Sequence, residues 1–145
     1  MDFEFLVAMG SLARIEPSPE LCEKEMEESE YDLQAARRCL SENDAKWSII
    51  KSYYSMFHGA KGVLFLIGFR EKTHRGVADA LDVLCREGKL ESGFANDFRA
   101  ALGAREGADY SYKHPKETAE SLLEMADEFC ARMRKLAKTL DKKPK

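Results

Sequence analysis

The chain has 145 residues, of which 44% are hydrophobic and 34% charged, and its formal net charge is −3. This length suits one domain with one core, and the composition is that of a globular protein rather than a disordered one. No apolar run approaches the roughly 20 residues that a membrane-spanning helix needs. The N-terminal stretch FEFLVAMGSLARI starts among acidic residues and lacks the basic region of a signal peptide. We therefore expect a cytoplasmic protein without a membrane segment.

The cysteines fit a reducing compartment. Cys22, Cys39, Cys85 and Cys130 are scattered singly, with no C-x-x-C pair. A structural zinc site takes ligands paired on short turns, and a disulfide scaffold is smaller and richer in cysteine. We expect reduced thiols that pack as small apolar side chains.

Proline, glycine and capping residues divide the chain into five predicted helices, and no alternating pattern predicts a strand. The helices run from the Ser18-Pro19 start to about Leu40, from a cap at Asn43 or Asp44 to Gly68, from a cap at Thr73 to Gly88, from Ser92 to Ala108, and from Lys116 to Leu140. The loop DYSYKHP joins the last two. Residues 1–17 form an N-terminal arm or short extra segment, residues 18–141 the helical domain, and residues 142–145 a basic tail.

The last predicted helix carries the clearest packing signal. Its apolar residues keep a strict 3-4 spacing over three heptads: Ala119, Leu122, Ala126, Phe129, Met133, Leu136 and Leu140. Such a seam requires neighbouring helices, as in a bundle.

The second predicted helix is apolar on most sides and should be central. Its main core face holds Ile50, Tyr53, Phe57, Ala60, Leu64 and Ile67, and a row of small residues (Ser48, Ser52, Ser55, Gly59 and Gly62) lies nearly opposite. A third stripe alternates bases with aromatics: Trp47, Lys51, Tyr54, His58, Lys61 and Phe65. Because three faces need partners, we expect another subunit to cover part of this helix or its neighbour.

Charge is distributed unevenly. Residues 1–32 carry ten acids against Arg14 and Lys24, and the segment after Phe129 is strongly basic. Acids near helix starts and bases near helix ends complement the helix dipole, which is one interpretation. The other is a basic tail for nucleic acid or an acidic partner.

The three histidines are candidates for different roles. His58 lies on the mixed stripe, where it is either a hydrogen-bonded core residue or a ligand contact. His74 follows Thr73 at a helix start, and His114 precedes Pro115 in a loop, where its imidazole could act freely. No two histidines have an i, i+4 spacing, so we expect no metal site.

The segment ALGAREGADY concentrates unusual features. Arg105 and Asp109 lie one helical turn apart, Tyr110 follows, and Gly103 and Gly107 each cost about 1 kcal/mol relative to alanine in a helix. Glycines in a helix favour a close approach of another backbone, so this helix is predicted to be a contact surface. The Arg105–Asp109 pair either holds the helix in place or marks a phosphate-binding cleft. No Walker loop, G-x-G-x-x-G or G-x-S-x-G is present.

Four strings in order, YDLQAA, SYYSMFHGAKGVLFLIGF, KTHRGV and AREGADY, resemble the HEPN family of prokaryotic helical proteins, particularly its small stand-alone members. The resemblance covers about residues 20–140. It implies an all-α, up-and-down antiparallel bundle of four main helices plus a short helix, paired as a homodimer. We expect no cofactor. It also implies a minimal nucleotidyltransferase as partner, with many family members acting as toxins or RNases.

The RNase members of that family carry R-x(4-6)-H, whereas eight residues separate Arg105 from His114 and three separate Arg70 from His74. Two hypotheses follow. The first is a dimeric binding module that works with a nucleotidyltransferase or binds a nucleotide, through Arg105, Asp109, Tyr110, His74 and His58. The second is a metal-independent RNase whose catalytic candidates are Arg105 and His114, because histidine transfers protons near neutral pH while arginine holds phosphate.

Overall fold

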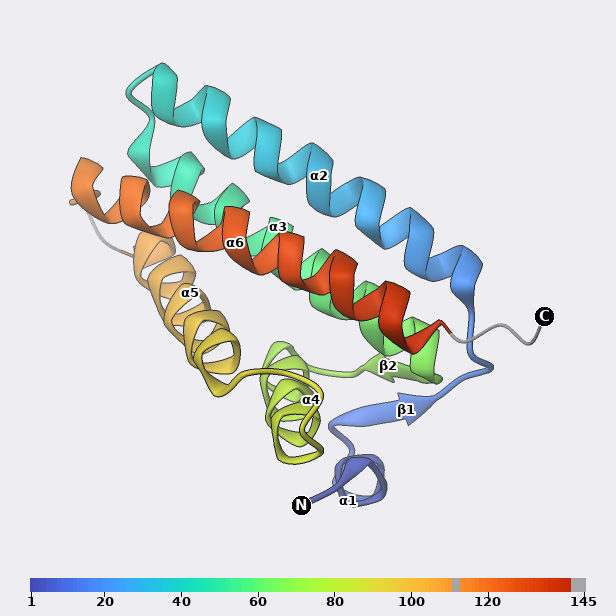
Figure 1. Ribbon diagram of the computed structural model, residues 1–145. Coiled ribbons are helices and arrows are strands. Elements are labelled where there is room, and N and C mark those ends of the chain that lie inside the picture. The colour runs from blue at the N-terminus through green and yellow to red at the C-terminus, as the bar shows by residue number, and fades with distance from the viewer. Residues whose placement is uncertain (111–112, 142–145) are drawn as a thin grey trace.

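The computed structural model describes residues 1–110 and 113–141, and helices dominate it (Figure 1). The helices are α1 (Phe3–Ala8), α2 (Pro19–Ser41), α3 (Ala45–Ile67), α4 (His74–Arg86), α5 (Ser92–Tyr110) and α6 (Lys116–Leu140). The predicted all-α fold of four main helices plus a short one is confirmed, with α4 as the short helix. The loop before α6 is shorter than predicted, because residues 109 and 110 still belong to α5.

The helices begin where the capping residues predict. Ser18, Asp44 and Thr73 each accept a hydrogen bond from the backbone nitrogen three residues later, at 2.8–3.1 Å. These bonds satisfy amide groups that have no partner inside the helix. Gly68 ends α3 with a φ of 95°, a left-handed conformation that favours glycine.

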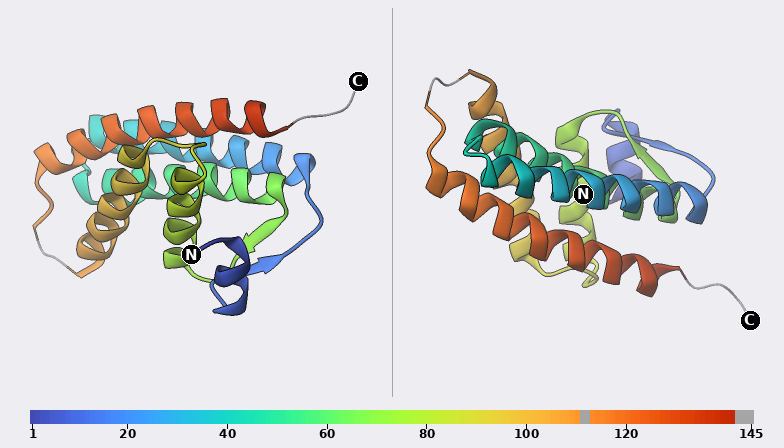
Figure 2. Two further views of the ribbon diagram at one scale, coloured as in Figure 1. Left: turned by 60° about the horizontal axis from the view of Figure 1, so that its bottom comes forward. Right: turned by 90° about the horizontal axis from the view of Figure 1, so that it is seen from above.

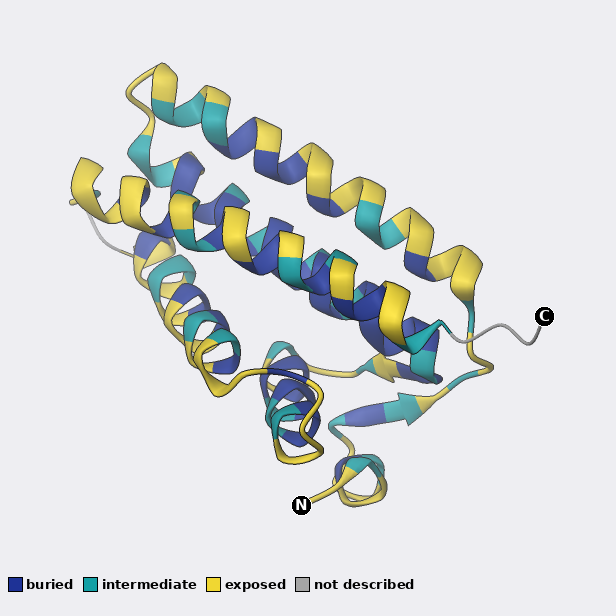
Figure 3. Ribbon diagram, viewed as in Figure 1, coloured by how far each residue is buried: buried dark blue, intermediate teal, exposed yellow. Residues whose placement is uncertain are grey.

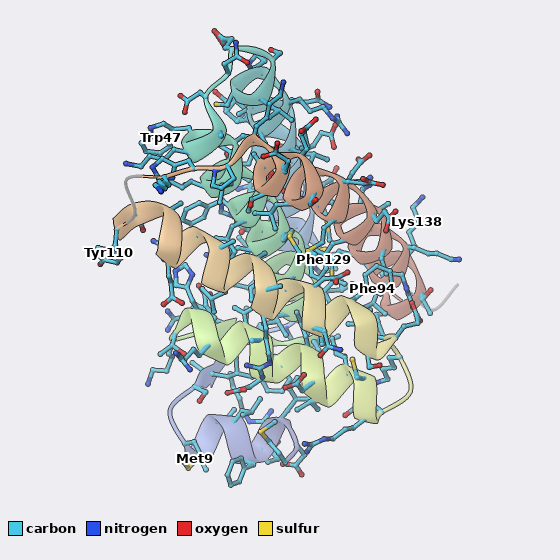
Figure 4. The ribbon with its side chains drawn as sticks, turned by 90° about the vertical axis from the view of Figure 1, so that its left-hand side faces the viewer. Met9, Trp47, Phe94, Tyr110, Phe129 and Lys138 are labelled. Carbon is cyan, nitrogen blue, oxygen red and sulfur yellow. The ribbon has the colours of Figure 1, made fainter. Side chains whose placement is uncertain are left out.

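The long helices α2, α3 and α6 run along one another, and α4 and α5 cross them on one side (Figures 1 and 2). Helix α3 lies at the centre and is buried along nearly its whole length, as Figure 3 shows. The seam of α6 is confirmed: all its members from Ala119 to Leu136 are at most 4% exposed. Phe129 on this seam contacts Phe94 of α5, with ring centroids 6.3 Å apart (Figure 4).

The small-residue row of α3 packs inside this chain. A Cβ atom on Gly59 would lie 3.4 Å from Met133 of α6, and one on Gly62 would lie 3.2 Å from the backbone oxygen of Cys22 in α2. Ser48 Oγ donates a hydrogen bond to the backbone oxygen of Ala36 at 3.0 Å. Since α2 and α6 of the same chain already cover this row, the row gives no reason to expect a second subunit.

A small sheet, which the sequence did not predict, joins the N-terminal residues to the bundle. Strands β1 (Leu12–Arg14) and β2 (Phe69–Glu71) pair antiparallel, with Ala13 opposite Arg70. Three residues are too few to show an alternating pattern, and the partners lie far apart in the sequence. Phe3 of α1 stacks on Phe69 at 4.7 Å, so the N-terminal segment packs on the start of α4 and the end of α3.

The four cysteines are free thiols, as predicted. None of the helices in residues 1–110 and 113–141 has both the length and the apolar character to cross a bilayer.

Candidate functional site

A mixed polar and aromatic cluster lies where α3, α4 and α5 meet. We call it the Arg105 site and define it as Tyr53, Tyr54, His74, Arg105 and Asp109. The two tyrosines come from successive positions of α3, the histidine is the first residue of α4, and the other two lie one turn apart near the end of α5. The caps of α3 and α4 fix where these two helices begin, and the packing of α3, α4 and α5 brings the side chains together.

Arg105 is held by contacts from two helices. Its Nη2 donates a hydrogen bond to Tyr54 Oη at 3.0 Å, and its Nε lies 3.5 Å from Asp109 Oδ2. Its guanidinium carbon is 5.5 Å from the ring centroid of Tyr54 and 5.9 Å from that of Tyr53, distances typical of cation–π contacts. The side chain is 26% exposed, so it remains accessible from solvent. Its buried Nε has no hydrogen-bond partner in the described part of the chain.

His74 is fixed by Tyr53 and Phe57. The Tyr53 hydroxyl and His74 Nδ1 are 2.6 Å apart, and the imidazole stacks on the Phe57 ring with centroids at 4.4 Å. Burial and, after it, the positive charge of Arg105 lower the pKa of His74 below its ordinary value of 6.5. Burial also raises the pKa of the Tyr53 hydroxyl. Both groups are therefore neutral at physiological pH, and Arg105 is the cation of the site.

Acidic and basic side chains border the site. Lys61 Nζ lies 3.6 Å from Glu71 Oε2 and faces the rings of Phe57 and Phe65 at 5.9 and 5.4 Å. Glu71 Oε1 is buried and has no hydrogen-bond partner among the described residues. Charges of both signs thus surround the aromatic rings, and the site can offer arginine donors, a neutral imidazole and aromatic faces to a ligand.

The structure brings together some of the predicted site residues and separates others. Of the residues predicted to bind a ligand, His74, Arg105 and Asp109 lie in one cluster. Tyr110 ends α5 and is 88% exposed, and Figure 4 shows it pointing away from the bundle. His114 borders a small cavity of about 150 Å³ with Leu40, Asn43, Ala45 and Lys116. Within the described residues of one chain, no contact joins Arg105 to His114.

His58 lies on the other side of Tyr54, in a second polar cluster. Its Nδ1 is 2.8 Å from Glu25 Oε1, and its Nε2 is 3.6 Å from Asp32 Oδ2. Asp32 is 7% exposed, and its burial raises the pKa of its carboxyl group, against the lowering effect of Lys51 and His58. Donor atoms of Glu28, Asp32 and His58 lie within 4.8 Å of one another, so these three residues could hold a metal ion.

The basic C-terminal segment contributes to packing where it is described. Arg132 forms two hydrogen bonds with the carboxylate of Glu91, at 2.7 and 3.0 Å, and these bonds lower the pKa of that carboxyl group. Arg134 pairs with Glu30 at 3.7 Å. These pairs favour the structural interpretation of this segment. The predicted basic tail, residues 142–145, lies outside the described residues, as do residues 111 and 112.

Sequence reasoning missed Tyr53 as a polar partner and missed Asp32 and Glu25 altogether. Tyr53 was placed in the core, which is correct for its ring, although its hydroxyl reaches His74. A signal for Asp32 was present in YDLQAA, where it lies one turn before Ala35 and Ala36 and next to Leu33. A carboxylate on the apolar stripe of a helix is buried and needs a partner.

Comparison with known proteins identifies the family. The sequence profile described as HEPN domain matches residues 22–136. The chain is 28% identical over 117 residues to the Methanocaldococcus jannaschii protein named "Putative toxin MJ0605", a match that covers 79% of this chain and 87% of that protein. It is 41% identical over 59 residues to the Pyrococcus horikoshii protein named "UPF0332 protein PH1297", which covers 41% of this chain and 42% of that one. Since the profile spans most of the helical bundle, including α3 and the Arg105 site, the chain belongs to the HEPN domain family.

Proposed function

We propose that this protein is a dimeric HEPN binding module that takes the phosphate of a nucleotide or of single-stranded RNA at the Arg105 site. The observation that carries the proposal is the guanidinium of Arg105, which lies against two tyrosine rings, is partly exposed and has an Nε without a hydrogen-bond partner in the described residues. A planar guanidinium can donate two hydrogen bonds to one phosphate. An aromatic ring beside it, such as Tyr54, can stack on a base.

A phosphate that binds Arg105 must compete with the carboxylate of Asp109. Asp109 approaches Arg105 only at 3.5 Å and is itself exposed, so a phosphate can displace it without leaving a buried charge unpaired. The neutral His74 adds no repulsion to an anion and can donate or accept a hydrogen bond.

The test is the affinity of the purified protein for ATP and for a fluorescent single-stranded RNA, measured by anisotropy at several salt concentrations. Arg105→Ala should weaken binding. It should also reduce the slope of log affinity against log salt concentration by about 1, the amount expected for one lost phosphate contact. The matched control is Arg99→Ala on the same helix, since Arg99 is already paired with Asp79 and Asp82 at 2.9 and 2.5 Å. Equal affinities and salt slopes for the parent and Arg105→Ala, or no binding by the parent at low salt, would refute the proposal.

We infer the dimer from α5. Gly103 and Gly107 have no neighbouring atom within 4 Å of a Cβ position among the described residues, so this face of the helix is open to a second backbone. Light scattering at micromolar concentration tests this, and a monomer would contradict it.

A metal-independent RNase is the second candidate, because the site holds an arginine beside an imidazole that is neutral at physiological pH and can accept a proton. Incubation with total RNA in the presence of a chelator tests this activity. If His74 is the base, His74→Gln abolishes cleavage and His114→Gln retains it. If the partner's His114 completes the cleft, the opposite pattern is expected.

The partner proposed for this module is a minimal nucleotidyltransferase, as the family resemblance implies. The relative from M. jannaschii bears the name of a toxin, which supports a role in a toxin–antitoxin pair. Identification of the adjacent gene, followed by expression of the chain with and without a nucleotidyltransferase encoded there, tests this role. Growth that slows only when the chain is expressed alone, together with co-purification of the two proteins, is the expected result.

A further inference from the structure

The cluster of Glu25, Glu28, Asp32 and His58 is separate in chemistry from the Arg105 site. Glu28 and Asp32 are one turn apart on α2, so their side chains lie on the same face of that helix. His58 reaches them from α3, and Glu25 binds the same imidazole from one turn earlier on α2. The proposed nucleotide site uses none of these side chains.

The hydrogen bond to Glu25 decides which nitrogen of His58 is available. An ionised carboxylate only accepts hydrogen bonds, so the 2.8 Å contact requires the proton on Nδ1. In the neutral imidazole Nε2 then carries a lone pair, and this atom lies 3.6 Å from Asp32 Oδ2. A lone pair and a carboxylate oxygen repel each other unless a cation lies between them.

The distance between His58 Nε2 and Asp32 Oδ2 indicates whether a proton or a metal ion would lie between these two atoms. An imidazolium donating to Asp32 would draw the two atoms to about 2.7–2.9 Å. Two ligands of one zinc ion, each about 2.0–2.2 Å from the metal, lie roughly 3–4 Å apart. The observed 3.6 Å exceeds the first range and falls within the second.

The burial of Asp32 is the second observation that points to a cation. This residue is 7% exposed, yet its carboxylate accepts no hydrogen bond from the described residues. Its nearest cation, Lys51 Nζ, is 3.9 Å from Oδ1, the oxygen that does not face His58. A largely buried carboxylate whose nearest cation is 3.9 Å away is costly, and a metal ion at Oδ2 would offset that cost.

We propose that Glu28, Asp32 and His58 bind one divalent transition-metal ion, with Glu25 as the group that orients the imidazole. One nitrogen and two carboxylate oxygens suit Zn²⁺, and a carboxylate on the far nitrogen of a histidine ligand is the usual support of such sites. Glu28 is exposed, so the ion would keep an open coordination position toward solvent. The expectation of no metal site rested on the spacing of histidines and cysteines along the sequence, whereas these ligands come from two helices.

The experiment is a calorimetric titration of the chelator-treated protein with ZnCl₂, with the absorption spectrum of added Co²⁺ as a second readout. The expected result is one ion per chain and a raised melting temperature. His58→Gln and Glu28→Gln should abolish this binding, and Glu25→Gln should weaken it roughly 10- to 100-fold. His114→Gln is the matched control, because it removes an imidazole outside the cluster and should bind as the parent does.

Two further results keep the proposal open to refutation. Lys51→Met removes the ammonium beside Asp32 and should tighten zinc binding; an unchanged affinity would place the ion elsewhere. Because Glu28 is exposed, Glu28→Gln should fold as the parent does, which circular dichroism would verify. Absence of binding by the parent up to millimolar zinc, or equal binding by parent and His58→Gln, would show an ion-pair network of histidine and carboxylates instead of a metal site.

Discussion

Opposite sides of α3 are built from different chemistry. Toward α2 and α6 the helix presents serines and glycines that let the neighbours come close, and three of its serines are completely buried. Toward α4 and α5 it presents Tyr53, Tyr54 and Phe57, whose rings surround His74 and Arg105. Small residues make a closed helix contact, whereas large aromatic residues with hydroxyl groups hold charged side chains at a partly exposed junction. The same helix thus supplies both the rigid support and the candidate site.

The largest effect is expected from truncating the core that both sides share. Leu64 is 0% exposed, so Leu64→Ala should lower the free energy of unfolding by about 2–5 kcal/mol, through lost burial and a residual cavity. Phe57→Ala should cost a similar amount and should also release His74. Urea denaturation measures both. Leu21→Ala, at a leucine that is 40% exposed, is the control and should change little. A small effect at Leu64 would mean that α3 is not central.

The next prediction compares Gly62, which packs against α2, with Gly107, where a Cβ would have no neighbouring atom within 4 Å among the described residues. Gly62→Leu should destabilise the protein by about 1–3 kcal/mol, because its Cβ would already lie 3.2 Å from the backbone of α2. Gly107→Leu should instead stabilise the isolated chain by up to about 1 kcal/mol, since leucine favours a helix more than glycine does. Thermal melts of the two variants, taken on the monomer below the dimer dissociation constant, should shift in opposite directions. Shifts of the same sign would contradict the contrast between the closed and open surfaces.

The contrast also shows what sequence periodicity can predict. The core face of α3 and the seam of α6 follow directly from the 3-4 spacing of apolar residues, and both are buried except at their last members, Ile67 and Leu140, which are partly buried. The capping residues Ser18, Asp44 and Thr73 placed the helix starts. Periodicity could not tell whether the small-residue row of α3 meets a helix of the same chain or of another. That choice depends on how the helices fold back in three dimensions.

The candidate site was less predictable than the fold. Arg105 and Asp109 form their pair within one helix, so their spacing was sufficient to predict it. His74 reaches Arg105 only because α4 and α5 both cross α3, and Glu25 reaches His58 only because α2 and α3 pack side by side. Contacts between helices depend on packing and rotation, which one sequence does not display as a pattern.

The open face of α5 gives a sharper test of the dimer than oligomeric state alone. Gly107→Trp places a large ring where we expect a second chain and should raise the dimer dissociation constant at least about tenfold, or about 1.4 kcal/mol. Gly93→Trp is the matched control, because Gly93 is on the same helix and is equally open within the described residues. Sedimentation measures both. Equal dimerisation of the two variants would move the interface away from Gly107.

The smallest effect expected is the pH dependence that His74 confers on stability. Its pKa is lower in the folded protein than its ordinary value of 6.5, mainly because of burial and then because of Arg105. The unfolded chain therefore binds more protons in the window just below 6.5, and the free energy of unfolding should fall as the pH is lowered through that window. His74→Gln should remove this part of the slope, whereas His114→Gln should retain it. Urea denaturation between about pH 5.5 and 7.5, above the range in which ordinary carboxyl groups titrate, isolates the effect. If His74→Gln and the parent showed the same dependence of unfolding free energy on pH, the pKa of His74 would be equal in the folded and unfolded protein. The aromatic side of α3 would then be as accessible to water as an open surface.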